Sequence, residues 1–208
     1  MTSAANRESA GFLADAHSVL AEVVGTYGPP KLPARRPPDG HFGALCESVA
    51  YQQLAGAAAE KIHGRFVLAC DGDVSAARVA SLSFDTLRSV GLSGSKVGTI
   101  QGIAGAVLDG SLPLDSIARK SDEEISRMLC ELRGIGPWTA EMFLMFQLGR
   151  RDVWPVGDYA VRVGWTNLFG LPELIAPKAL REAGAPYSPH RSALAWYCWQ
   201  SVDTAGRA

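Results

Sequence analysis

Hydrophobic residues recur at intervals of three and four positions along most of the chain, and residues 96–108 give the most regular stretch. Within it, five apolar residues follow the spacing i, i+3, i+4, i+7 and i+8. That period matches a helical turn, so it predicts one helix with a single buried face. The five residues are Ile100, Ile103, Ala104, Val107 and Leu108.

Capping residues mark where other helices begin. Ser121 and Glu124 match a capping box, in which each side chain accepts a hydrogen bond from the other's backbone N–H. Pro137 stands where a first helical residue is expected, because an N–H there would have no helical partner. Period and caps together predict the remaining helices at about residues 12–24, 42–54, 57–66, 75–82, 83–90, 122–132, 137–148, 159–168, 177–183 and 189–199.

Two segments are expected to lie outside helices. Residues 1–8 are small and polar, and we expect them to be frayed. Residues 29–39 contain five prolines and predict an extended strap that carries Arg35 and Arg36. No stretch alternates apolar and polar residues between turns, so no sheet is implied. The sequence therefore predicts an all-α protein of about ten short helices.

The composition narrows the classes of protein to which the chain can belong. With 47% hydrophobic residues in 208, it can form a large core without metals or disulfides, as one domain or two small lobes. The formal net charge of -1 argues against a protein that coats nucleic acid by bulk charge. The first ten residues do not resemble a signal peptide, and no apolar run is long enough for a membrane span. We expect a soluble cytoplasmic protein, associated with the nucleoid if it is bacterial.

Cysteines and histidines do not form a metal-binding pattern. The four cysteines lie far apart, which predicts buried free thiols in a reducing compartment. The histidines show no ligand-like spacing, and we expect them on the surface or at helix caps. These residues are Cys46, Cys70, Cys130, Cys198, His17, His41, His63 and His190.

The segment Gly134-Ile135-Gly136 lies between two predicted helices. Two glycines let the backbone approach a partner closely, and the N-terminus of a helix that begins at Pro137 favours a phosphate oxygen. The simpler interpretation is a tight connector between helices. The capped amphipathic helix before the turn and the apolar helix after it favour a helix-hairpin-helix, which binds the DNA backbone without net positive charge.

Asp158 precedes the predicted helix 159–168 and is the candidate catalytic residue. Considered alone, it is best explained as an N-cap. The two roles are compatible, because the helix dipole stabilises an ionised carboxylate. A carboxylate that faces a sugar stabilises a developing oxocarbenium ion, or orients or deprotonates the attacking water.

Trp138, directly after the turn, is the first candidate for an aromatic base pocket. A desolvated indole face attracts a cationic alkylated purine by about 1–2 kcal/mol. Such a base already leaves readily, which agrees with the lack of a nearby His or Glu pair at proton-donor spacing. Phe42, Tyr51, Tyr159 and Trp199 are further candidates, and for each of them a place in the core is an equally good interpretation.

Together these residues resemble those of the helix-hairpin-helix DNA glycosylase superfamily, and of its alkylpurine branch, the 3-methyladenine DNA glycosylase II proteins. The segment from Gly134 to Ala140 and its spacing to Asp158 are typical of that branch. The resemblance runs from about residue 39 to the end of the chain. Three other stretches are similar: Tyr51-Gln52-Gln53-Leu54, Gly91-Leu92-Ser93 with Lys96, and residues 188–199.

The resemblance implies roles for individual residues. Asp158 would be the catalytic aspartate, and Leu54, beside Gln53, would be the wedge that fills the space of the flipped base. DNA contacts of the hairpin would come from Gly134, Ile135, Gly136 and Thr139. The base pocket would be lined by Trp138, Met142, Trp199, Tyr51, Tyr159 and Phe42. The carbonyls of Leu132 and Ile135 would be the ligands of a monovalent cation.

Differences from other branches narrow the prediction. Bifunctional relatives carry a lysine where this chain has Trp138, so the resemblance implies a monofunctional enzyme that uses water. After the hairpin only Cys198 remains, so the iron–sulfur cluster of some relatives is not expected. The chain is too short for the N-terminal β-domain of larger relatives. Met142 is aromatic in some relatives, which leaves the preferred alkylated base open.

The expected protein is an all-α glycosylase domain with two helical lobes, residues 1–54 with 159–208 and residues 55–158, and the active-site cleft between them. Its expected reaction is hydrolysis of the N-glycosidic bond of 3-methyladenine- or 7-methylguanine-type purines flipped out of damaged duplex DNA. We expect it to act as a monomer, with no cofactor, membrane or obligate protein partner. Two alternatives remain: a non-catalytic damage-sensing protein, which would release no base, and a bifunctional glycosylase/lyase on oxidised bases, which borohydride would trap on DNA.

Overall fold

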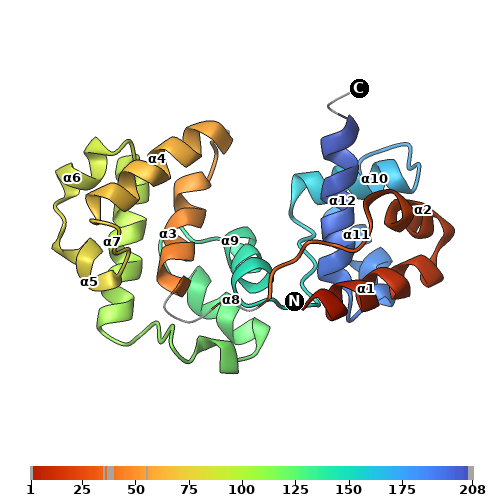
Figure 1. Ribbon diagram of the computed structural model, residues 1–208, viewed down its shortest axis with the longest axis horizontal. Helices are drawn as coiled ribbons and strands as arrows, with labels where there is room; N and C mark the ends of the chain where they lie inside the picture. The colour runs from red at the N-terminus through yellow and green to blue at the C-terminus, as the bar shows by residue number, and fades with distance from the viewer. Residues whose placement is uncertain (1, 35, 37–39, 55, 206–208) are drawn as a thin grey trace. The chain divides into compact units, whose positions relative to one another are not determined.

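The computed structural model describes residues 2–34, 36, 40–54 and 56–205, and every regular element among them is helical (Figure 1). The all-α prediction is therefore confirmed. Of the predicted strap, residues 29–34 and 36 are described and lie outside helices, whereas Arg35 falls outside the described residues. Within the same ranges, no helix combines the length and apolar character of a membrane span.

The chain divides into two compact units. One is contiguous, residues 36–143, and contains the hairpin; we call it the hairpin unit. The other combines residues 1–35 with 144–208 and contains Asp158; we call it the carboxylate unit. These bounds differ from the approximate lobe boundaries predicted at residues 54 and 158. Helix α3 (His41–Tyr51) belongs with the hairpin because it packs on helices of that unit.

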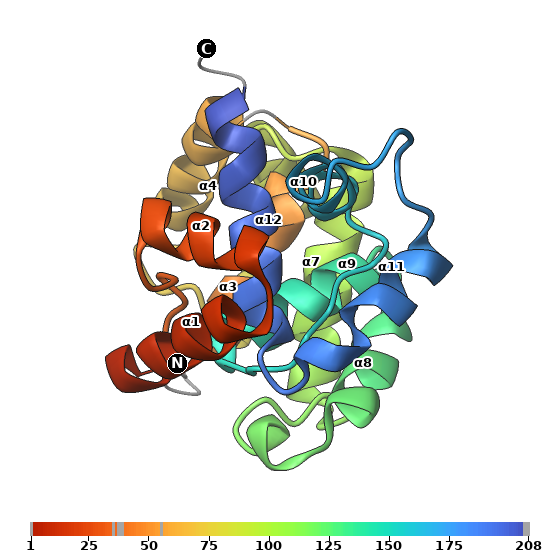
Figure 2. The same cartoon turned by 90° about the vertical axis from the view of Figure 1, so that its right-hand side faces the viewer.

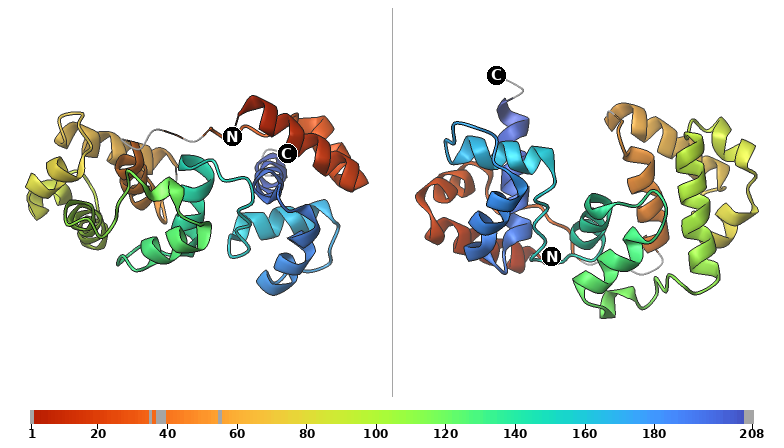
Figure 3. Two further views of the ribbon diagram at one scale, coloured as in Figure 1. Left: turned by 90° about the horizontal axis from the view of Figure 1, so that it is seen from below. Right: turned by 180° about the vertical axis from the view of Figure 1, so that it is seen from behind.

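Helix α7 (Gly94–Leu108) lies at the centre of the hairpin unit (Figure 3). It packs against α3, α5 (Ala76–Ser81) and α6 (Phe84–Ser89). Of the predicted stripe, Ile100, Ile103 and Ala104 are fully buried. Leu108 is 57% exposed, because it is the last residue of the helix, and Val97 and Ala106 extend the buried face instead. The described residues of this unit also form α4 (Gly56–Ala69), α8 (Asp122–Cys130), α9 (Pro137–Met142) and the 3₁₀ helix η2 (Ile117–Arg119).

Helix α12 (Arg191–Ala205) lies at the centre of the carboxylate unit, with α1 (Ser3–Ala16) and α2 (Ser18–Tyr27) on one side and α10 (Tyr159–Leu168) on the other (Figure 2). The unit also contains α11 (Pro177–Gly184) and the 3₁₀ helix η4 (Ala185–Tyr187). Gly164 on α10 allows the close approach of α12. A Cβ atom there would lie 2.0 Å from the carbonyl oxygen of Cys198.

The N-terminal segment differs from the prediction in two ways. The single helix expected at residues 12–24 is two helices, because His17 is extended and its Nδ1 accepts a hydrogen bond from the N–H of Val19 at the start of α2. Residues 3–8, expected to be frayed, form the first turns of α1. They are ordered because Thr2 caps the helix and the Asn6 amide donates to the carbonyl of Leu32, 2.9 Å away.

Some expectations for cysteines and histidines were wrong. Cys130 is exposed because it ends the amphipathic helix α8 on its polar side, whereas Cys46, Cys70 and Cys198 are buried free thiols as predicted. His17 is the expected capping residue. His41 and His190 are buried, the former against the ring of Phe143 and the latter against that of Phe12.

Candidate active site

The hairpin turn joins α8 to α9. The capping box of Ser121 and Glu124 is present at the start of α8, as the sequence predicts. In the turn, the N–H of Ile135 donates to the carbonyl of Leu132 at 3.1 Å. Gly134 has φ +86°, and a Cβ atom there would lie 2.0 Å from Thr99 Oγ1. The backbone conformation and the buried neighbour therefore both require glycine at this position.

The fold does not require glycine at position 136. Its φ of -107° suits any residue, and a Cβ atom there would meet no atom within 4 Å. It is the N-cap of α9 without a side-chain hydrogen bond, and Pro137 follows as the first helical residue. The first backbone N–H groups of a helix have no partner within it. An unobstructed turn with such groups is suited to a phosphate oxygen.

The side chains of Ile135 and Thr139 face the interior. Both residues are buried, and Thr139 Oγ1 accepts a hydrogen bond from the Gln52 amide at 3.2 Å. Any contact of these two residues with DNA would therefore come through their backbone. The carbonyl of Leu132, predicted as a cation ligand, accepts the N–H of Ile135 and keeps a second lone pair.

The predicted wedge follows α3 in a turn of residues 51–54. The N–H of Leu54 donates to the carbonyl of Tyr51 at 3.3 Å, and Gln53 is left-handed, with φ +55°. Leu54 is 41% exposed, so its side chain is accessible for insertion into DNA.

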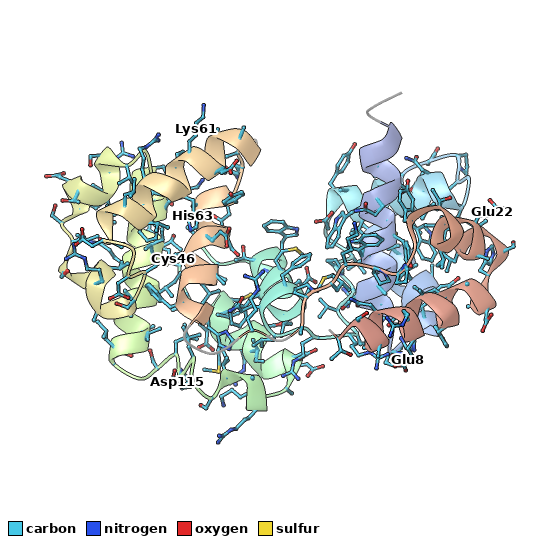
Figure 4. All side chains as sticks on the ribbon, in the orientation of Figure 1. Glu8, Glu22, Cys46, Lys61, His63 and Asp115 are labelled. Carbon is cyan, nitrogen blue, oxygen red and sulfur yellow. The ribbon has the colours of Figure 1, made fainter. Side chains whose placement is uncertain are left out.

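The predicted pocket residues of the hairpin unit differ in exposure. Trp138 is 42% exposed, which favours a binding role over a place in the core. Met142 and Phe42 are buried. Tyr51 is half-buried, with its ring edge against His63, which projects beside α3 in Figure 4. For Phe42, burial favours the core interpretation.

Hydrogen bonds from two helices of the carboxylate unit position Asp158. It is the N-cap of α10, and its Oδ1 accepts the N–H of Val161 at 2.9 Å. The indole Nε1–H of Trp199 on α12 donates to the same oxygen at 3.3 Å. The sequence predicts the cap, and the resemblance implies that Trp199 lines the base pocket, but neither predicts this bond. Trp199 thus orients the carboxylate in addition to any contact with a base.

The ring of Trp199 stacks on Phe146, which the sequence did not indicate as a site residue. The two centroids lie 5.9 Å apart with an interplanar angle of 28°. Phe146 lies in the π-helix Phe143–Gln147, which continues α9 and rotates the following side chains relative to an α-helix. The position of Tyr159, the first residue of α10, is 69% exposed.

Among the described residues, no group of three or more His, Cys, Asp or Glu side chains is arranged to hold a metal ion. The candidate site residues comprise an oriented carboxylate and aromatic faces in one unit, and a turn suited to a phosphate oxygen with an exposed leucine in the other.

The chain is similar to known proteins of DNA repair. The family described as HhH-GPD superfamily base excision DNA repair protein matches residues 46–189. The DNA-3-methyladenine glycosylase 1 of Schizosaccharomyces pombe is 33% identical over 189 residues, which cover 89% of this chain and 82% of that protein.

Two solved structures have the same fold. The S. pombe 3-methyladenine DNA glycosylase Mag1, in complex with abasic DNA, matches with a TM-score of 0.85 at 29% identity, over 93% of this chain and 95% of that one. The DNA-3-methyladenine glycosidase of Bacillus halodurans matches with a TM-score of 0.83 at 30% identity, over 96% and 91% of the two chains.

Proposed function

Because the chain belongs to the HhH-GPD superfamily of base excision DNA repair proteins, we propose that it is a monofunctional DNA glycosylase for alkylated purines. It hydrolyses the N-glycosidic bond of 3-methyladenine- or 7-methylguanine-type bases flipped out of damaged duplex DNA. The observation that carries the proposal is the carboxylate of Asp158, held by Val161 and Trp199. The names of the most similar relatives support the substrate class.

The hairpin unit binds the DNA. Backbone N–H groups at Gly134 and Gly136 bind phosphate, and Leu54 occupies the space of the extruded nucleotide. Extrusion costs a few kcal/mol, and less for a weakly paired lesion, so the cost itself favours damaged sites. Trp138 offers a face to the cationic base.

The carboxylate unit supplies the chemistry. As the bond between sugar and base lengthens, the electron pair leaves with the already cationic purine, which departs neutral. The carboxylate of Asp158 stabilises the positive charge that develops on the sugar. Water then attacks the sugar and loses a proton, which leaves an abasic site. Trp138 replaces the lysine of bifunctional relatives, so the proposal includes no covalent adduct.

The test is incubation of the protein with methylated duplex DNA and identification of released bases by chromatography. The proposal expects free 3-methyladenine or 7-methylguanine and intact abasic DNA strands. Release of no base from any lesion would leave a damage-sensing protein as the better proposal. A covalent protein–DNA adduct trapped by borohydride would show a lyase mechanism instead. We propose that the active species is a monomer, which sedimentation with and without duplex DNA checks.

A further inference from the structure

The turn of residues 51–54 is weakly supported by its own backbone. Its two backbone hydrogen bonds, from Gln52 N–H to Val49 and from Leu54 N–H to Tyr51, are both 3.3 Å long. Gln53 has a positive φ, which side-chain-bearing residues rarely adopt. A turn of this kind keeps one conformation only when neighbouring groups hold it.

The first contacts that hold the turn of residues 51–54 are hydrogen bonds from its Gln52 side chain to the hairpin. The side-chain amide nitrogen of Gln52 donates to the carbonyl of Gly134 at 3.1 Å and to Thr139 Oγ1 at 3.2 Å. An amide nitrogen has two hydrogens, so it makes both bonds at once. One acceptor lies in the hairpin turn and the other in the first turn of α9. Gln52 therefore joins the wedge turn to the part of the hairpin that is suited to phosphate.

The second contact that holds the turn is made by Lys96, in the first turn of α7. The ammonium of Lys96 donates to the carbonyls of Ala50 and Gln52, at 2.9 and 2.8 Å. These carbonyls stand at the C-terminal end of α3, where a cation also interacts favourably with the helix dipole. Partial burial lowers the pKa of Lys96, as expected for an amine that faces the protein. Its charge is directed to the backbone beside the wedge.

We propose that Gln52 and Lys96 are positioning residues that fix the wedge turn to the hairpin, so that phosphate binding and insertion of Leu54 occur as one event. This inference rests on the proposed function, because it assumes that the hairpin and Leu54 contact damaged DNA. With both connections intact, a phosphate bound at the hairpin sets the position of Leu54. Without them, the hairpin still binds phosphate, but the wedge moves independently of it.

The test compares the affinity of the full chain for two duplexes of one sequence, one undamaged and one with a tetrahydrofuran abasic analogue, at several salt concentrations. We expect Gln52→Leu and Lys96→Met to bind the undamaged duplex within about twofold of the native chain, with an unchanged salt slope, because phosphate contacts persist. The preference for the analogue falls about tenfold, since misplaced groups lose their contribution. Lys96→Arg restores part of the preference, because a guanidinium also donates to carbonyls.

Matched controls come from the same unit. Gln101 on α7 also donates its amide to a backbone carbonyl, that of Leu82, and Gln101→Leu should leave the preference unchanged. Lys61, exposed on α4 (Figure 4), gives the control Lys61→Met for loss of one charge. Should Gln52→Leu not fold, Thr139→Val removes one of the same hydrogen bonds with little change of shape, and we expect a loss in the same direction.

Three results would overturn the inference. A salt slope reduced by about one in Lys96→Met would assign Lys96 a direct phosphate contact. Equal losses on the two duplexes would make Gln52 and Lys96 general binding or folding residues. A native chain without preference for the analogue would leave nothing for them to position. None of these measurements requires base release, so failure of the glycosylase proposal is detected separately by chromatography.

Discussion

The hairpin unit and the carboxylate unit hold their candidate functional groups in different ways. In the hairpin unit, the candidate groups are the backbone of a turn and the exposed side chains of Leu54 and Trp138. The amide of Gln52 donates to Thr139 and helps to hold the turn. In the carboxylate unit, one side-chain oxygen of Asp158 is the centre, and Trp199 and Phe146 support it from two helical segments. In the proposed function, binding thus depends on a backbone turn with exposed apolar side chains beside it, whereas chemistry depends on one carboxylate.

This difference accounts for a DNA-binding protein with a net charge of -1. A turn that binds phosphate through N–H groups needs no excess of lysine or arginine on the surface. The ammonium of Lys96 is directed to two backbone carbonyls of its own unit. The two units should therefore respond differently to substitution: changes in the hairpin unit alter DNA affinity, and changes around Asp158 alter the rate of base release.

The largest effect is expected for Asp158→Asn, which should slow base release while leaving DNA affinity unchanged. Asparagine caps a helix as well as aspartate, so the fold and the affinity for abasic-analogue duplex should persist. Base release should fall about 10²- to 10³-fold, because the charge that stabilises the sugar cation is gone. Asp115→Asn, at an exposed position, is the control. Depurination of methylated DNA at the native rate by Asp158→Asn would remove Asp158 from the mechanism.

A comparison of the two hairpin glycines tests whether the turn serves the fold, the ligand or both. Gly134→Ala should lower the free energy of unfolding by about 2–4 kcal/mol, because the new methyl group collides with Thr99 and the positive φ becomes strained. Gly136→Ala should leave it within about 0.5 kcal/mol, since its methyl group meets no atom, yet weaken DNA binding. Urea unfolding and duplex titration measure the two effects. Equal stability losses would show that Gly136 is also a folding residue.

The corresponding test in the carboxylate unit is Gly164→Ala. Its Cβ atom would meet the backbone of Cys198, which moves only with α12, so we expect a loss of about 1–3 kcal/mol in the free energy of unfolding. Because α10 carries Asp158 at its start and α12 carries Trp199, base release should fall more than DNA affinity. Gly25→Ala on α2, where a methyl group meets nothing, should be neutral or stabilising by up to about 1 kcal/mol. A larger effect on DNA affinity than on base release would contradict the assignment of chemistry to this unit.

Local signals predicted much of the fold, and long-range contacts account for part of what they missed. The capping box of Ser121 and Glu124 and Pro137 at the start of α9 depend on neighbours within one turn, so the sequence is sufficient to place them. The position of Asp158 at the start of α10 was predictable for the same reason. The π-helix that presents Phe146 depends on a change of helical period, and the bond from Gln52 to Gly134 depends on a distant segment. The break at His17 is local, because its side chain caps α2, but histidine is not among the residues preferred as caps.

The smallest expected effect is a change in the free energy of unfolding with pH, caused by a histidine of the carboxylate unit. Nδ1 of buried His190 lies 2.9 Å from the hydroxyl of Ser9 and 3.2 Å from the guanidinium of Arg151. Because arginine only donates, Nδ1 is the acceptor and the ring is neutral. Burial lowers the pKa of His190, and the charge of Arg151 lowers it further, whereas Glu8 (labelled in Figure 4) and Asp152 act in the opposite direction.

The sign of the effect follows from this lowered pKa. Above about pH 7.5 the ring is neutral in both states and contributes no pH dependence. As the pH falls through about 6.5, the unfolded chain binds the proton first, so the free energy of unfolding should decrease by about 0.5–1 kcal/mol between pH 7.5 and 5.5. The decrease ends once the folded protein also binds the proton. His190→Gln keeps a hydrogen-bonding side chain without a proton to titrate, and should flatten this part of the curve, whereas His17→Gln, at an exposed cap, should not. If the free energy of unfolding of His190→Gln, measured with urea, keeps the native dependence on pH across this range, His190 is not the source of the pH dependence.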